Sequence, residues 1–183
     1  MSSEKALILK AVARHDNDAF AALVRMHQSK IRSYLVRLCQ NYDLADDIAQ
    51  ETFLTAFRKL KSYNGSGNFS GWLFQIAHNS FLQHLRRSRR RIEISDQYEI
   101  QQELQTERYD SISTLQMDLE QAIRKLNSDE AATISLCHSY GFSHQEVADI
   151  LNMPLGTVKS NISRGKSKLK EIFKATNNLE QAS

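Results

Sequence analysis

The most informative part of the sequence reads SHQEVADILNMPLGTVKS, from Ser143 to Ser160. Ser143 and Glu146 have the S-x-x-E spacing of a capping box, in which each side chain accepts a hydrogen bond from a backbone N–H group at the start of a helix. Apolar residues at helical spacing follow, and Pro154 marks the point where this helix has ended and a second helix begins. The pattern predicts two helices joined by a tight turn, which is a helix-turn-helix.

The second of these helices has two different faces. Its apolar positions are expected to face inward: Leu155, Val158, Ile162, Leu169 and Phe173. Hydroxyl and basic residues form the other face: Thr157, Ser160, Ser163, Arg164, Ser167 and Lys168. Such a face suits the major groove of DNA, because short polar side chains reach base edges while Lys and Arg neutralise phosphates, although a solvated basic face is the alternative. Gly165 is expected near the buried side, where it permits close helix packing.

The rest of the chain continues this helical pattern. One Pro and six Gly interrupt 183 residues, and alternating runs of β-branched residues are missing. Apolar spacing predicts helices over Phe20–Leu38, Leu44–Lys61 and Phe69–Ser80, and a further helical unit from Leu115. The inward stripe of the second of these helices is Ala49, Phe53, Ala56, Phe57 and Leu60. We expect an all-α fold of two small helical domains joined by a flexible acidic linker, with the boundaries 5–91 (first domain), 92–114 (linker), 115–175 (second domain) and 176–183 (tail).

Charge is distributed unevenly along the chain. The net charge of +3 is only mildly basic and does not by itself indicate a nucleic-acid partner. However, two basic blocks, Arg86–Arg91 and Lys159–Lys174, flank the mainly acidic stretch Glu93–Glu120. The acidic stretch is rich in Gln, Glu, Asp and Ser without an apolar face, which is typical of a solvated linker. Two separate cationic surfaces are implied.

The helix-turn-helix resembles region four of RNA polymerase sigma factors. The matching residues are Gly141-Phe142-Ser143, Glu146-Val147-Ala148, Met153-Pro154 and Gly156-Thr157-Val158-Lys159-Ser160. The resemblance implies that the second helix docks at the minus-35 promoter element, with Lys159, Asn161, Ser163 and Arg164 at positions that contact DNA in the family. The predicted minus-35 set adds Thr157, Ser160 and Lys168 from the outward face of the helix. One departure is Arg164-Gly165-Lys166, where the family usually has Arg-Ala-Arg, because Lys166 lacks the bidentate fork of an arginine.

The predicted helix Leu44–Lys61 has a polar face with apolar members opposite its core side. On its own this face could be an ordinary solvated surface. The stretch Asp43–Phe53 nevertheless resembles region 2.2 of sigma factors, which grips the clamp helices of the largest polymerase subunit. The resemblance implies a polymerase-binding set of Asp47, Ile48, Gln50, Glu51, Leu54 and Arg58.

A polar loop, Ser62–Asn68, precedes a helix whose flank combines aromatic, amide and cationic residues: Trp72, Gln75, Asn79, Gln83, Arg86 and Arg90. This combination suits single-stranded DNA, because a ring stacks on an unpaired base, amides bind its edge and arginines follow the backbone. Trp72 could instead be a core residue with an exposed edge. The segment from Phe69 to Asn79 resembles the minus-10 recognition segment of extracytoplasmic-function sigma factors, where the loop and an Asn form a pocket for a flipped base. The implied minus-10 set also includes Tyr63, Asn64, Ser66 and Asn68.

The resemblance covers about Ala19–Arg91 and Leu115–Phe173, and regions one and three of larger sigma factors are missing. It implies a minimal, two-domain factor of the extracytoplasmic-function group. The implied partners are promoter DNA and core RNA polymerase, through the clamp helices of its largest subunit and the flap of its second-largest subunit, and an anti-sigma factor. The acidic linker is hypothesised to pass near the RNA exit path as a nucleic-acid mimic.

The sequence carries no pattern for catalysis, a cofactor or a metal. Its histidines at 78, 84, 138 and 144 are expected on different helices or faces, and no nucleophile motif accompanies them. Cys39 and Cys137 lie far apart without a CxxC pair, so two buried free thiols are expected. The first fifteen residues hold no long apolar run, so we expect no membrane insertion and a cytoplasmic location.

Two other functions stay open at this point. A conventional helix-turn-helix regulator would bind double-stranded operator DNA without polymerase, as a symmetric dimer. A nuclease would use Asp46, Asp47 or Glu51 with magnesium, although Asp46 is expected to point away from the other two carboxylates.

Overall fold

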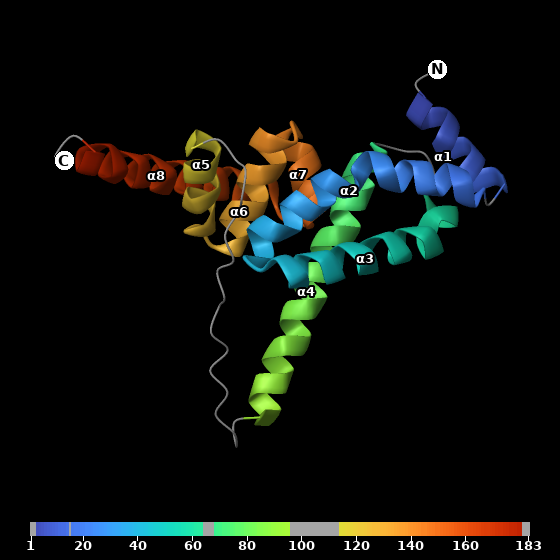
Figure 1. The fold of residues 1–183 in the computed structure, drawn as a ribbon, viewed down its shortest axis with the longest axis horizontal. Coiled ribbons are helices and arrows are strands. Elements are labelled where there is room, and N and C mark those ends of the chain that lie inside the picture. The colour runs from blue at the N-terminus through green and yellow to red at the C-terminus, as the bar shows by residue number, and fades with distance from the viewer. Residues whose placement is uncertain (1–2, 15, 64–67, 96–113, 181–183) are drawn as a thin grey trace. The chain divides into compact units, whose positions relative to one another are not determined.

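The computed structural model describes residues 3–14, 16–63, 68–95 and 114–180. All regular secondary structure in these ranges is helical, and the chain divides into two compact units, Met1–Gln105 and Thr106–Ser183 (Figure 1). The prediction of an all-α, two-domain fold is confirmed. None of the described helices is apolar over a length that would cross a bilayer.

The first unit contains four long helices and one short turn of helix. They are α1 (Ser3–Arg14), α2 (Asn17–Cys39), α3 (Tyr42–Lys59), the 3₁₀ turn η1 (Leu60–Ser62) and α4 (Phe69–Ser95). Helices α2, α3 and α4 correspond to the three predicted helices, whereas α1 was not among them. Helix α1 packs against α2 and η1.

Short polar side chains set the boundaries of α2 and α3. Asp16 caps α2 by accepting a hydrogen bond from the backbone N–H of Ala19 at 3.0 Å. The helix ends at Gln40, which has a left-handed backbone with φ of 54°. The next residue, Asn41, caps α3 by accepting from the N–H of Leu44 at 2.9 Å. The chain therefore passes from α2 to α3 in only two residues.

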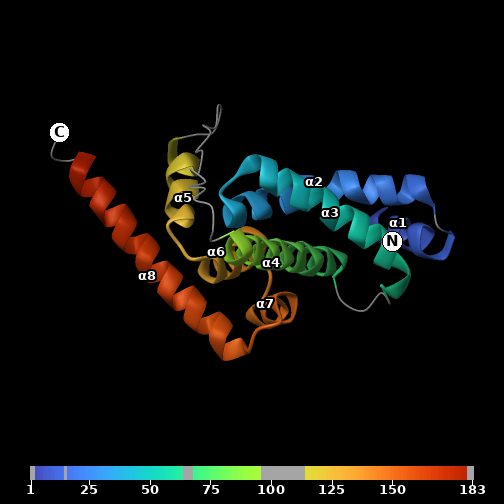
Figure 2. The same ribbon diagram turned by 90° about the horizontal axis from the view of Figure 1, so that it is seen from below.

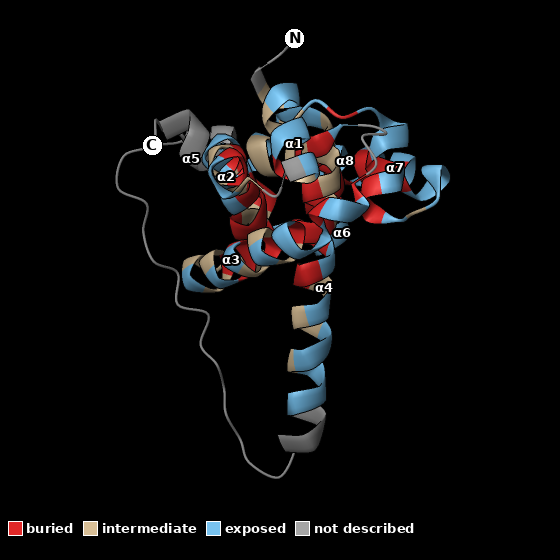
Figure 3. Ribbon diagram, turned by 90° about the vertical axis from the view of Figure 1, so that its right-hand side faces the viewer, coloured by how far each residue is buried: buried red, intermediate tan, exposed pale blue. Residues whose placement is uncertain are grey.

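The core of the first unit lies between α2, α3 and α4. Tyr34 on α2 is fully buried, with its ring edge-on to Phe74 of α4 at a centroid distance of 5.3 Å. Its hydroxyl oxygen lies 3.0 Å from Nδ1 of His78, so the two polar groups pair inside the core. No described residue of α4 after Phe81 is buried, and this half of the helix continues past α2 and α3 (Figure 3). From Leu82 to Arg91, α4 is therefore at least partly exposed to solvent.

The second unit contains α5 (Thr114–Arg124), α6 (Ser128–Ile134), the π-helical turn η2 (Ser135–Ser139), α7 (His144–Leu151) and α8 (Leu155–Glu180) (Figure 2). Its core is formed by Ile134, Leu136, Val147, Leu151, Val158 and Ile162. Helix α8 continues to Glu180, five residues into the predicted tail, and α4 continues to Ser95, four residues into the predicted linker. The linker hypothesis otherwise concerns residues 96–113, which lie outside the described ranges.

Some side chains lie differently from the sequence expectation. Phe57, expected in the core, is 46% exposed, and its ring centroid lies 5.1 Å from that of Phe20. Leu155 is exposed because it is the first residue of α8, before the helix reaches its packing partners. Cys39 and Cys137 are both free but only partly buried. Burial raises the pKa of the Cys39 thiol to about 12, so this thiol is not reactive.

Candidate nucleic-acid interface

The start of α7 is fixed by the predicted capping box. The backbone N–H of Ser143 donates to Oε2 of Glu146 at 2.8 Å, and the N–H of Glu146 donates to Oγ of Ser143 at 3.3 Å. These hydrogen bonds favour the ionised carboxylate and lower the pKa of Glu146. The helix therefore begins at a definite residue, which sets the position of the turn that follows it.

The turn between α7 and α8 is three residues long (Figure 2). Asn152 ends α7 in a left-handed conformation with φ of 51°, and the N–H of Met153 donates back to the carbonyl of Ala148 at 3.0 Å. The carbonyl of Pro154 then accepts from Val158 at 3.1 Å, in the first turn of α8. Because Val158 is fully buried against the unit, the opposite face of α8 points to solvent. The predicted helix-turn-helix is confirmed.

The exposed face of α8 contains most of the residues predicted for it. Thr157, Lys159, Ser160 and Ser163 are all exposed. Ser160 donates its hydroxyl hydrogen to the carbonyl of Gly156 at 2.9 Å, which leaves the oxygen able to accept a further hydrogen bond. This part of α8 offers hydroxyl groups and a lysine without apolar side chains between them, apart from Leu155 at its start.

Asn161, to which the resemblance assigns a DNA contact, does not present its side chain to solvent. Its side chain is buried, at 3% exposure, and its Nδ2 lies 4.0 Å from the sulfur of Met153. Its Oδ1 accepts a hydrogen bond from Nη2 of Arg164 at 2.6 Å. The amide therefore faces Met153 in the turn and the guanidinium of Arg164, because position 161 lies on the same helical face as the buried Val158 and Gly165. Asn161 contacts an exposed arginine instead of presenting its own amide to solvent.

Lys168 lies on the exposed face of α8, as expected, but its ammonium group also contacts the protein. Its Nζ lies 2.9 and 2.8 Å from the two carboxylate oxygens of Glu130 on α6. Glu130 is only 1% exposed. Gly165 lies next to this pair, and a Cβ at this position would be 2.3 Å from Cδ1 of Ile134. The predicted role of Gly165 in close helix packing is therefore confirmed.

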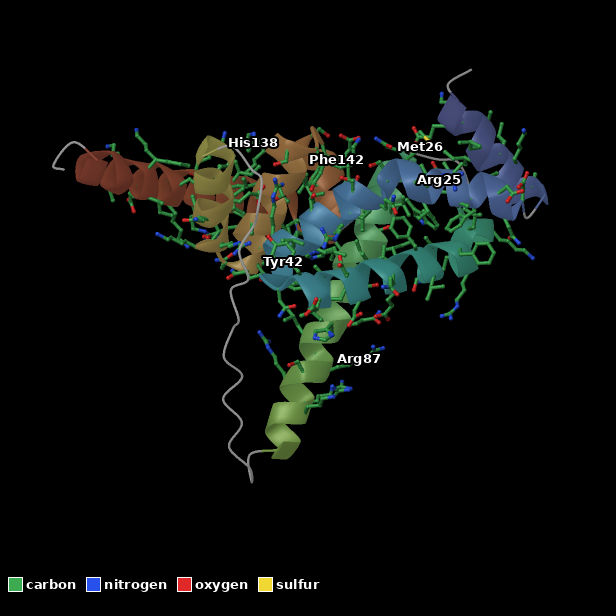
Figure 4. All side chains as sticks on the ribbon, in the orientation of Figure 1. Arg25, Met26, Tyr42, Arg87, His138 and Phe142 are labelled. Carbon is green, nitrogen blue, oxygen red and sulfur yellow. The ribbon has the colours of Figure 1, made fainter. Side chains whose placement is uncertain are left out.

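The polar face of α3 lies mainly as predicted. Asp47, Gln50, Leu54 and Arg58 are exposed, and Glu51 is partly exposed with its Oε1 3.9 Å from Nη1 of Arg87 on α4 (Figure 4). Leu54 is 57% exposed, and the exposed Phe57 lies three residues further along the helix. Ile48, in contrast, is 2% exposed, because its position turns toward the core of the first unit.

Asp46 does not join the other carboxylates of α3. It forms a two-point ion pair with Arg32 of α2, in which Nε contacts Oδ1 and Nη2 donates to Oδ2 at 3.0 Å. The same guanidinium lies over the ring of Tyr42 at 5.8 Å (Figure 4). Among the described residues, no group of three or more His, Cys, Asp or Glu side chains could hold a metal ion.

The predicted stripe on α4 follows one side of the helix into its exposed half. Asn79, Gln83, Arg86 and Arg90 are exposed, and Gln75 is partly exposed. Trp72 is partly buried, with its ring centroid 5.3 Å from that of Tyr63 and 5.5 Å from that of Phe69. The stripe therefore begins at an aromatic cluster and ends at arginines that point to solvent.

The loop before α4 is only partly described. Asn68 is exposed, and its Oδ1 accepts from the N–H of Ser70 at 2.9 Å, so it caps the start of α4. Tyr63 is buried at 8% exposure and belongs to the aromatic cluster, which places its ring against Phe69 and Trp72 instead of in solvent. Asn64 and Ser66 lie outside the described residues.

Comparisons with known proteins agree with this arrangement. Residues 23–91 match the family Sigma-70 region 2, and residues 116–169 match Sigma-70, region 4. The chain is 31% identical over 179 residues to the ECF RNA polymerase sigma factor SigW of Bacillus subtilis, an alignment that covers 89% of this chain and 93% of SigW. It is 34% identical over 164 residues to the ECF RNA polymerase sigma factor SigE of Mycolicibacterium smegmatis, covering 82% of this chain and 60% of that protein.

A solved structure also has the same fold. It is the sigma factor RpoE in complex with the anti-sigma factor NepR from Bartonella quintana, with a TM-score of 0.71, 29% identity, and coverage of 85% of this chain and 96% of the matched chain. The chain belongs to the extracytoplasmic-function (ECF) group of RNA polymerase sigma factors. As an ECF sigma factor it recognises promoters for RNA polymerase, and a conventional regulator that binds operator DNA alone is not supported.

Three features of this ECF sigma factor could not be seen in its sequence. Glu130 is the buried partner of Lys168, Met153 contacts Asn161, and Phe57 extends the exposed apolar surface next to Leu54. The Glu130 contact joins residues 38 positions apart. The only sequence signal for Glu130 is its place in the capping box with Asn127, and that signal explains a helix start without indicating a contact with α8.

Proposed function

We propose that this ECF sigma factor divides its work between three surfaces of described residues. The exposed face of α8 docks in the major groove at the minus-35 element, the stripe on α4 captures the melted minus-10 strand, and the polar face of α3 binds the clamp helices of the largest polymerase subunit. The observation that carries the proposal is the pairing of a helix-turn-helix in one unit with an aromatic-to-arginine stripe in the other.

On α8, the proposed direct contacts are made by Thr157, Lys159, Ser160, Ser163 and Arg164. Their hydroxyl and guanidinium groups can reach base edges and phosphates in the groove. Asn161 is assigned a different role from the one the resemblance implied, because its buried amide contacts Arg164. Arg164 in turn keeps a side chain that is 60% exposed, so it can still reach DNA.

On α4, we assign base contacts to the first half of the stripe and phosphate contacts to the second half. Trp72 is partly exposed near the start of α4, and Asn79 lies exposed about two helical turns further along. Arg86 and Arg90 are exposed on the stretch of α4 from Leu82 to Arg91, where no side chain is fully buried and phosphates can approach them. Tyr63 and Asn68 support this site, the first by packing under Trp72 and the second by capping α4.

On α3, Leu54 and Phe57 supply apolar surface between charged and amide side chains. Interfaces usually place such an apolar centre inside a polar rim, here formed by Asp47, Gln50 and Arg58. Ile48 supports the surface from beneath because it is buried. We further assign contact with the flap of the second-largest polymerase subunit to the second unit.

Regulation by a protein partner is also proposed. The similar RpoE of Bartonella quintana was solved in complex with the anti-sigma factor NepR. We infer that an anti-sigma factor restrains this chain by covering polymerase- and DNA-binding surfaces. Sigma factors are not enzymes, so we assign the chemistry of initiation to the polymerase, and we place the protein in the cytoplasm, where promoters and polymerase are found.

The experiment is in vitro transcription from a promoter library with core polymerase, with and without this protein, followed by sequencing of the transcripts. We expect initiation that depends on the protein, at promoters that share two spaced elements. N79A should weaken selection at the minus-10 element only, and S163A at the minus-35 element only. S29A changes an exposed serine on α2, a helix that contributes to none of the three surfaces, and serves as the control. Tight operator binding without any protein-dependent transcript would refute the proposal.

A further inference from the structure

A buried carboxylate, that of Glu130 on α6, lies against the helix that we assign to the minus-35 element. Its Oε2 accepts a hydrogen bond from the N–H of Asn127 at 3.3 Å, which fixes it at the start of α6. Both of its oxygens then lie within 2.9 Å of Nζ of Lys168 on α8. A buried charge is stable only with such partners, so Glu130 and Lys168 hold α8 against α6.

Arg164 lies one helical turn before Lys168 and is close to the same carboxylate. Its Nε is 3.8 Å from Oε1 of Glu130, and its Nη2 donates to Oδ1 of Asn161 at 2.6 Å. The guanidinium is therefore held from two sides, although most of the side chain is exposed. A guanidinium has five N–H donors, so these contacts leave donors free for a base edge or a phosphate.

We propose that Glu130 is a positioning residue for minus-35 recognition. It neutralises Lys168 so that this lysine makes no phosphate contact, and together with Asn161 it orients Arg164 toward the bases. The proposal rests on the proposed function, in which α8 docks at the minus-35 element. The negative charge of buried Glu130 offsets one of the two positive charges that Arg164 and Lys168 place next to each other on α8. The attraction of α8 to any DNA phosphate backbone is therefore weaker, while the oriented contact of Arg164 with the bases is kept. The expected result is stronger discrimination between promoter sequences.

The proposal and a purely structural role for Glu130 predict different results for E130Q. A structural role predicts weaker binding to every DNA, with unchanged salt dependence. Under the proposal, E130Q frees Lys168 to contact a phosphate, which steepens the slope of log K against log salt by about 0.9. Binding to unrelated DNA then rises, and discrimination against a promoter with an altered minus-35 element falls by roughly tenfold, because a well-oriented bidentate contact is worth about 1–3 kcal/mol.

The test uses holoenzyme made from the full-length chain and core polymerase. Binding is measured at several salt concentrations to the best promoter from the library and to the same promoter with its minus-35 element replaced. The variants are E130Q, K168Q, the double variant E130Q/K168Q, and K159Q as the matched lysine on the exposed face. We expect K159Q to flatten the slope by about 0.9, K168Q to leave it unchanged, and the double variant to restore the slope that E130Q alone has steepened.

Two results would overturn the proposal. One is a K168Q slope that flattens as much as that of K159Q, which would make Lys168 a phosphate contact. The other is an E130Q holoenzyme that loses affinity for both DNAs equally. If E130Q does not fold, as judged by circular dichroism, the comparison of K168Q with K159Q still decides. Failure of the proposed function is seen separately, because wild-type holoenzyme would then bind both promoters equally.

Discussion

At the scale of single residues, Ser143 makes the clearest contribution to stability. Its side chain and that of Glu146 satisfy each other's backbone N–H groups at the start of α7. Loss of a serine cap costs about 1 kcal/mol, so we expect S143A to lower the free energy of unfolding by about that amount and to speed hydrogen exchange of the first amides of α7. S167A, at an exposed helical serine in the same unit, should change neither. An S143A protein with exchange like the wild type would contradict this account of the cap.

The buried His27 predicts how the stability of the first unit depends on pH. Burial lowers the pKa of His27 more strongly than the carboxylate of Glu4, 2.9 Å from its Nε2, raises it; nearby Lys30 also lowers it. The unfolded chain therefore binds a proton more readily than the folded one. The contribution of His27 to stability is complete above about pH 6.5 and decreases as the pH falls below that value.

The measurement is denaturant unfolding at pH 7.5 and 5.5. The fluorescence of Trp72 follows the first unit, because it is the only tryptophan of the chain. E4Q removes the group that raises the pKa of His27, so its stability should fall more steeply with acid than that of the wild type. H27Q should lose part of the pH dependence. If the stabilities of the wild type and H27Q fell equally between pH 7.5 and 5.5, groups other than His27 would cause the pH dependence.

At the scale of helices, the close approach of α6 and α8 depends on Gly165. A Cβ there would be 2.3 Å from Cδ1 and 3.3 Å from Cγ1 of Ile134, a buried side chain. Overpacking costs about 1–3 kcal/mol, against a gain of about 1 kcal/mol when Ala replaces Gly in a helix. We expect G165A to destabilise the second unit, and G165A/I134V, which removes Cδ1, to recover at least the wild-type stability. Thermal unfolding followed by circular dichroism checks this, with I134V alone as control.

Sequence reasoning succeeded where neighbours along one helix decide the outcome. The Ser143 cap, the turn at Pro154 and the stripe on α4 all follow from local spacing, and the structure contains each of them. It failed where a contact joins distant parts of the chain. Lys168 has the expected position on its helix, but its partner, Glu130, is 38 residues away in the sequence. The burial of Asn161 goes with a contact between its amide and Met153 in the turn before α8.

At the scale of the whole molecule, binding of polymerase tests whether the exposed apolar surface of α3 has a partner. Leu54 and Leu9 are each 57% exposed, but Leu9 lies on α1, outside the proposed surface. An apolar anchor at the centre of an interface costs more than about 1 kcal/mol when truncated, so we expect L54A to weaken binding to core polymerase by roughly tenfold and L9A to leave it unchanged. Equal losses for both variants, or none for L54A, would count against the proposed surface.

The half of α4 beyond Phe81 has a further physical consequence. None of its side chains from Leu82 to Arg91 is fully buried, and it carries five arginines between positions 86 and 91. Like charges one turn apart destabilise an isolated helix, and a short helix with little packing is only marginally stable in water. The coil form of this segment should therefore be populated at equilibrium in the free protein. Arg87 already lies 3.9 Å from Glu51 of α3. A phosphate backbone would supply further counter-charge to this segment, so that the DNA strand itself stabilises the helix that holds it.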